Sequence, residues 1–131
     1  MDTNVLFEGL SRKGECGRVV DLWADERLVP CVSTALALEY EEVLTRGQSE
    51  ERHRQVHMAL QALLIRAQFV PILFTYRPQS SDPDDDLVID CTMNAGATLV
   101  TSNVRDFRAA SKALGFTLMK PDELLELFAE E

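Results

Sequence analysis

The acidic side chains that could do chemistry are concentrated in one stretch, DPDDDLVID at residues 82–90. Carboxylates this close together repel one another unless water or a cation screens them. Part of the pattern is typical of a helix start, because Asp82 suits the N-cap, Pro83 the first helical position, and acids in the first turn interact favourably with the helix dipole. This accounts for Asp82 and Asp86 and leaves Asp84 and Asp85 without a purely structural explanation.

Helical periodicity separates these acids further. The helix predicted here has one apolar stripe, formed by Val88, Cys91, Thr92 and Ala95. At 100° per residue, Asp84 and Asp85 fall near this stripe, whereas Asp86 and Asp90 fall on the opposite side. We therefore expect Asp84 or Asp85 to turn toward the protein interior.

Glu39 is a second acid predicted to turn inward. The helix that Ser33 is expected to cap has a buried stripe formed by Leu36, Tyr40 and Val43. Glu39 falls inside this stripe, while Glu41 and Glu42 point away. Burying an unpaired carboxylate is costly, so a cation is the natural partner. Mg²⁺ is a hard ion that accepts carboxylate oxygens and keeps several waters, and it suits a site made mainly of acids.

Strands and helices alternate along the chain, and they must position these acids. Strands are predicted at 3–7, 27–32, 97–101 and 116–119, and the segment 69–76 is ambiguous. Helices are predicted between them, including one with Cys16, Val19, Val20 and Trp23 on its apolar face, and a final helix over 121–131. Apolar strands separated by helices indicate an α/β fold, a three-layer α/β/α arrangement around a central, mostly parallel sheet.

Such sheets bind ligands at the carboxyl ends of their strands. Asp2 lies beside the first predicted strand, and Ser102 and Asn103 directly follow the strand that ends at Thr101. These positions join Glu39 as candidates for one site.

Length, composition and charge predict the number of domains and the kind of surface that the protein presents. The 131 residues, 46% of them hydrophobic, predict a single domain over residues 1–131. No apolar run is long enough for a membrane helix and no leader pattern is recognised, so we expect a cytoplasmic protein. Acidic residues outnumber basic ones 22 to 13, which disfavours a general polyanion-binding surface. Any contact with nucleic acid is therefore expected to be local.

Four segments, taken in order, resemble the PIN-domain family, in the VapC-like branch of toxins from toxin–antitoxin systems. They are DTNVL, VSTALALEYEEVL, DPDDDLVID and ATLVTSNVRDF. The resemblance implies a metal-dependent endoribonuclease that hydrolyses RNA phosphodiester bonds with Mg²⁺ or Mn²⁺. It also implies a small antitoxin partner and a homodimer.

Carried over by position, the resemblance implies a catalytic set of Asp2, Glu39, Asp85 and Asn103. The first three would be metal ligands, so the choice between Asp84 and Asp85 is resolved for Asp85. Supporting roles would fall to Ser33, Thr101 and Asp106. Arg12, Lys13 and Arg105, isolated bases near the predicted site, are the candidates for contacts to substrate phosphates, although each one taken alone is better explained as a solvated surface charge.

Two departures from the family pattern keep an alternative open. Only Met1 precedes Asp2, which implies a shortened first strand, and Asn103 stands where many relatives have aspartate. The alternative is a catalytically silent PIN-like protein that binds a partner. A receiver-like signalling module, suggested by Thr101 and the Lys120–Pro121 pair, ranks lower because no aspartate ends a central strand.

Overall fold

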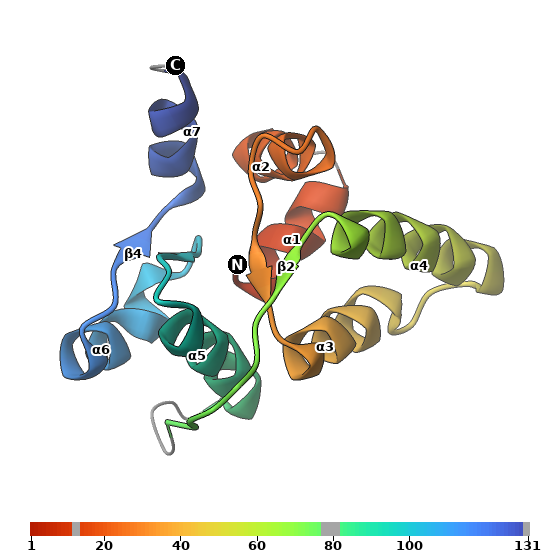
Figure 1. Cartoon of the computed structure of the whole chain (residues 1–131). Helices are drawn as coiled ribbons and strands as arrows, with labels where there is room; N and C mark the ends of the chain where they lie inside the picture. The colour runs from red at the N-terminus through yellow and green to blue at the C-terminus, as the bar shows by residue number, and fades with distance from the viewer. Residues whose placement is uncertain (12–13, 77–81, 130–131) are drawn as a thin grey trace.

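The computed structural model describes residues 1–11, 14–76 and 82–129 (Figure 1). Helices dominate it, and each strand is only two residues long. The elements in chain order are α1 (Thr3–Leu10), α2 (Gly14–Ala24), β1 (Cys31–Val32), α3 (Thr34–Thr45), α4 (Glu50–Ile65), β2 (Gln68–Phe69), α5 (Pro83–Ala95), β3 (Leu99–Val100), α6 (Val104–Leu114), β4 (Leu118–Met119) and α7 (Pro121–Ala129). In the described part of the chain, no helix is both long and apolar enough to cross a membrane.

The strands form two parallel pairs. β1 pairs with β2, and β3 pairs with β4. The α/β class and the parallel direction predicted from the sequence are therefore confirmed. A continuous central sheet is not formed by the described residues, because the two pairs are separate. The N-terminus lies between them, linked to β3 by one backbone hydrogen bond from Asp2 N–H to Val100 O, 2.9 Å long (Figure 1).

The strand predicted over residues 3–7 is wrong, because these residues begin helix α1. Val5, Leu6 and Gly9 are all buried, and Leu6 and Gly9, three residues apart, share a face in a helix but lie on opposite faces of a strand. Asp2 starts the helix, and its carbonyl accepts a hydrogen bond from Val5 N–H at 3.1 Å. A five-residue window was too short to distinguish the two patterns.

Local signals in the other helices are confirmed. Ser33 caps α3, with its hydroxyl accepting from Leu36 N–H at 3.1 Å. Asp82 caps α5 by accepting from Asp84 N–H at 2.9 Å, and Pro83 is its first residue. The apolar face predicted for α2 is buried in full: Cys16, Val19, Val20 and Trp23.

One side-chain assignment on α5 needs correction. Asp86 and Asp90 were expected on the face away from the core, yet they are 5% and 3% exposed. The reason is the segment after β2, which lies along this second face of α5. Asp90 accepts from Tyr76 N–H at 2.9 Å, and the Asn94 amide oxygen accepts from Leu73 N–H at 2.8 Å. The ambiguous segment 69–76 is thus extended chain held by side chains of α5, with regular strand only at Phe69.

Candidate active site

Asp2 and Thr101 form a buried, hydrogen-bonded part of the candidate site. Both are buried, at 4% and 0% exposure. The Thr101 hydroxyl donates to Asp2 Oδ2 at 2.8 Å and accepts from Asn103 N–H at 2.9 Å. One hydroxyl at the carboxyl end of β3 therefore orients two of the predicted site residues.

Asp85 lies in the first turn of α5 and is half-buried. Burial raises its pKa to about 7, with further contributions from the negative charges of Asp82, Asp2 and Asp106. Asp2 and Asp106 come from other elements, so the fold directs three carboxylates from different parts of the sequence toward one region. Burial also raises the pKa of Asp2, against the lowering effect of the Thr101 hydrogen bond.

Glu39 is buried on α3, as the periodicity predicted. Burial is the main cause of its raised pKa, and the Asp84 carboxylate is the next. Glu42 adds to the rise, and Arg46 opposes it. The choice left open by the helical stripe thus has a divided outcome, because Asp84 interacts with Glu39 and Asp85 interacts with Asp2.

Asn103 and Asp106 form a pair at the start of α6. Asn103 Nδ2 donates to Asp106 Oδ2 at 2.5 Å, and both side chains are exposed. The amide at the fourth position is therefore held by a carboxylate three residues later. Sequence reasoning named Asp106 without predicting this bond, although a spacing of three residues at a helix start is a usable signal.

The other predicted site residues are Ser33, Arg105, Arg12 and Lys13, and their positions say less about a catalytic role. Ser33 acts as a helix cap, and its hydroxyl accepts from a backbone N–H. Arg105 is exposed in the first turn of α6, beside Asp106 in the sequence. Arg12 and Lys13 lie outside the described residues.

A comparison with protein-family models decides the family. The model described as PIN domain matches residues 1–105, about four fifths of the chain. The chain belongs to the PIN-domain family. No curated protein and no solved structure gives a match. PIN domains are in general nucleases, and the matched region contains Asp2, Glu39, Asp85 and Asn103.

The donor set of this PIN domain fits a hard divalent cation. Its side chains offer carboxylate and amide oxygens, the ligands that Mg²⁺ and Mn²⁺ take up. Asp2, Glu39 and Asp85 all have raised pKa values, with burial the main cause, so a bound cation would favour their ionised forms. Within residues 1–11, 14–76 and 82–129, no three acidic, histidine or cysteine side chains already form a coordination group. Binding of a metal ion would thus require these side chains to move closer together.

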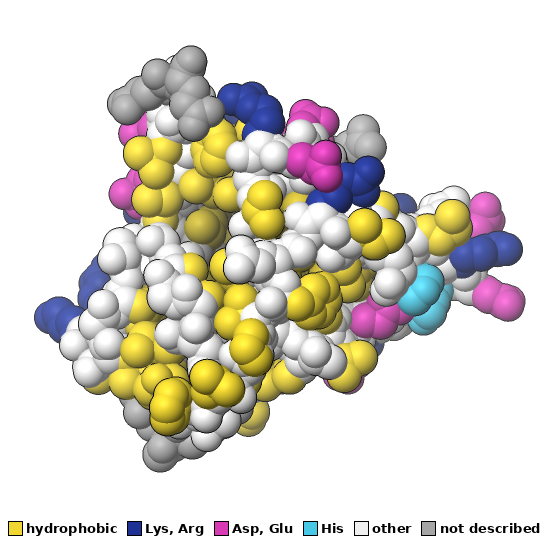
Figure 2. All heavy atoms as spheres, viewed as in Figure 1, with side chains coloured by type: hydrophobic (Ala, Val, Ile, Leu, Met, Phe, Trp, Pro, Cys, Tyr) yellow, Lys and Arg dark blue, Asp and Glu magenta, His cyan; other side chains and the backbone are white. Residues whose placement is uncertain are grey.

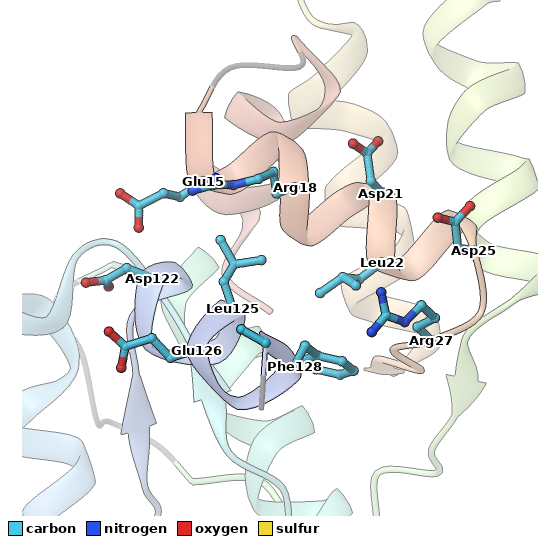
Figure 3. A pocket seen from close by; sticks show the side chains of 11 residues that line it. Glu15, Arg18, Asp21, Leu22, Asp25, Arg27, Asp122, Leu125, Glu126 and Phe128 are labelled. Carbon is cyan, nitrogen blue, oxygen red and sulfur yellow. The ribbon is translucent and has the colours of Figure 1, made fainter. Parts of the chain in front are cut away.

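A separate groove lies between α2 and α7 of the PIN domain, with a volume of about 610 Å³ (Figure 3). Acidic side chains line its sides, among them Asp21, Asp122 and Glu126, and Leu22, Leu125 and Phe128 contribute apolar surface. None of the described site residues lines it. Its size alone therefore does not make it the active site.

Proposed function

We propose that this PIN-domain protein is a Mg²⁺- or Mn²⁺-dependent endoribonuclease, the toxin of a toxin–antitoxin pair. The observation that supports this most is that Asp2 and Asp106, which come from other elements, lie close enough to Asp85 for their negative charges to add to the effect of burial, which raises its pKa to about 7. A shared divalent cation would relieve the repulsion between these carboxylates and favour their ionised forms, and such ions are typical of PIN-domain nucleases.

In this proposal Asp2, Glu39 and Asp85 hold the metal. A bound divalent ion would supply a more acidic water and stabilise negative charge on the phosphate oxygens. The Thr101 hydroxyl donates to Asp2 Oδ2 and so holds the Asp2 carboxylate in one orientation. Asn103 contributes a neutral amide at the fourth position, steadied by Asp106. Arg105 is the described cation closest in sequence to the site and is the candidate for a substrate phosphate.

The deciding experiment is cleavage of single-stranded and structured RNAs by purified protein with Mg²⁺, with Mn²⁺ or with EDTA. We expect cleavage with either metal and none with EDTA. Asp85→Asn should abolish it, because the variant loses a charged ligand without losing side-chain volume. Asp21→Asn, an exposed acid in the groove between α2 and α7, is the matched control and should cleave like the natural chain.

The competing function is a silent PIN-like protein that binds a partner. Asn103 at the fourth position favours it, since a less negative site holds a second metal ion less well. Mn²⁺ binding measured by calorimetry, without RNA turnover under any of the above conditions, would transfer the assignment to this alternative.

The toxin role and the assembly state are parts of the same proposal. We expect growth arrest when the protein is produced in cells, relieved by Asp85→Asn and by a small antitoxin encoded beside it. We also propose a cytoplasmic homodimer of single-domain chains, which light scattering on the purified protein would test. A growth arrest equally strong with Asp85→Asn would contradict the link between toxicity and RNA cleavage.

A further inference from the structure

The groove between α2 and α7 combines acidic sides with an apolar floor (Figure 3). Leu22, Leu125 and Phe128 lie between the two helices and form the floor. Its volume of about 610 Å³ is within the range of ligand-binding clefts. Because none of the described residues of the proposed nuclease site lines it, the proposed reaction gives this groove no role.

Each wall of the groove carries two carboxylates that are one helical turn apart. Asp21 and Asp25 are four residues apart on α2, and Asp122 and Glu126 are four residues apart on α7. Like charges at this spacing are neighbours on a helix and destabilise it. All four side chains are exposed, and in the described part of the chain none of them has an ion-pair partner. Both walls thus present carboxylates that are available to a cationic partner.

The two arginines of the groove do not reverse the sign of its charge. The Arg27 guanidinium lies 5.8 Å from the centre of the Phe128 ring, and Arg18 follows Glu15 by three residues on α2. Figure 2 shows acidic and basic side chains together over the region of α2, and acidic side chains on the outer side of α7. With five carboxylates and two guanidinium groups, the lining is negative. A polyanion, or a second copy of a chain with net charge −9, is therefore a poor occupant.

The apolar floor and the spacing of the carboxylates together fit an amphipathic helix with basic flanks. Such a helix has one apolar stripe, which would lie on the floor between α2 and α7. Lysine or arginine side chains one turn apart on each flank would then lie opposite the carboxylate pairs of the two walls. Their aliphatic stems can cover apolar surface while their charged ends reach the carboxylates. Charge and apolar surface thus select the same kind of partner.

We propose that the groove between α2 and α7 binds a basic amphipathic helix of a partner protein. The apolar face of this helix packs on Leu22, Leu125 and Phe128, and its two flanks pair with the acids of α2 and of α7. The proposal goes beyond the nuclease function and requires neither a metal ion nor RNA.

The test uses a fluorescent synthetic peptide made of two copies of Lys-Leu-Lys-Lys-Leu-Leu-Lys, which forms an apolar stripe when helical. Its matched control, two copies of Lys-Leu-Lys-Leu-Lys-Leu-Lys, has the same composition and charge without that stripe. Fluorescence anisotropy with the natural chain in EDTA measures both affinities. We expect the first peptide to bind about fivefold or more tightly than the control, because only its leucines all reach the floor. Circular dichroism should show the first peptide becoming helical when it binds.

The double variant Asp122→Asn with Glu126→Gln tests the acids of α7. Its affinity for the first peptide should fall by about fivefold or more, since two charge pairs are lost. The matched control is Glu50→Gln with Glu51→Gln, two exposed acids in the first turn of α4, and it should leave the affinity unchanged. Thermal unfolding of both double variants checks that each remains folded.

The opposite wall provides a second variant, Asp21→Asn with Asp25→Asn, which should cause a similar loss of affinity. Equal affinities for the two peptides would overturn the proposal, and so would unchanged binding in the variants of both walls. No saturable binding at peptide concentrations up to about 1 mM would overturn it as well. These readouts do not involve RNA cleavage, so they can fail while the nuclease proposal stands.

Discussion

At the scale of single residues, Thr101 holds two of the proposed site residues in place. Its hydroxyl donates to one oxygen of Asp2 and accepts from the backbone of Asn103, and the side chain is fully buried. A residue that acts through another in this way is a positioning residue. Its loss should change how Asp2 is held without removing any metal ligand.

Thr101→Val should therefore weaken metal binding and cleavage together. The variant keeps the shape of the side chain but leaves Asp2 Oδ2 and Asn103 N–H without their partner, which costs about 1–3 kcal/mol of stability. Mn²⁺ affinity should fall about 10- to 100-fold, the usual effect of losing a group that orients a ligand. Thr101→Ser, which retains the hydroxyl, should restore most of the affinity measured by calorimetry; unchanged affinity in Thr101→Val would contradict the positioning role.

The raised pKa of Asp85 predicts a pH-dependent gain in stability for Asp85→Asn in EDTA. The folded value of about 7 lies above the ordinary 3.8, so the folded state binds more protons between these values. The Asp85 contribution to the unfolding free energy thus falls as pH rises from about 4 to about 7. The variant should be more stable than the natural chain at about pH 8 and no more stable at about pH 4.

Urea unfolding at the two pH values measures this difference. Mg²⁺ should then stabilise the natural chain, because the bound cation removes the repulsion between its carboxylates. It should not stabilise Asp85→Asn, because this variant lacks one of the proposed metal ligands. Asp21→Asn, on the exposed face of α2, should show no such dependence on pH or Mg²⁺. The same pH difference in both variants would show that the effect is not local to the site.

The contact between α1 and α2 determines, at the scale of elements, how Asp2 enters the site. Gly9 is buried in this contact, and a Cβ at this position would lie 2.7 Å from Cys16 O and would also meet the Val20 side chain. The two helices can approach this closely only because residue 9 has no side chain. Any displacement of α1 would also displace Asp2 at its start.

Gly9→Ala should accordingly destabilise the fold, even though alanine is the better helix former. Because the obstructing atom on α2 is backbone, relief requires helix displacement, and we expect a cost of about 1–3 kcal/mol. Asn4→Ala, on the exposed face of the same helix, should change stability by less than about 0.5 kcal/mol. Thermal unfolding of both variants measures the difference, and a stabilised Gly9→Ala would show that α1 can shift freely.

Electrostatics dominates at the scale of the whole molecule, because the net charge is −9. RNA is repelled by most of the surface, so binding must depend on the metal and on a few local cations. The negative net charge therefore disfavours a broad nucleic-acid-binding surface, but it is compatible with a small catalytic site.

RNA binding by the inactive Asp85→Asn variant should therefore depend only weakly on salt. With one or two phosphate contacts, the slope of log affinity against log salt should be no steeper than about −2. Arg105→Gln in this background should reduce the slope by about 0.7, and the control Arg52→Gln on α4 should leave it unchanged. Fluorescence anisotropy at several salt concentrations measures the slope, and a steep slope would indicate an unrecognised basic surface.

The sequence by itself determined the features that depend on near neighbours. The caps Ser33 and Asp82, the inward direction of Glu39 and the buried face of α2 all follow from residues within a few positions, and all are confirmed. The family could also be predicted from four ordered segments, and the PIN-domain match confirms it. Local sequence is sufficient for these features because each of them depends on residues a few positions apart within one helix.

Only the tertiary structure decided the features that depend on distant partners. Asp86 and Asp90 are buried because the chain after β2 covers a second face of α5, and periodicity within α5 cannot reveal that cover. Residues 3–7 form a helix because α2 packs against them, and the raised pKa of Asp85 requires Asp2 and Asp106 from other elements. The physical reason is the same in each case: burial and charge interactions depend on distance in space, which the order of residues does not specify.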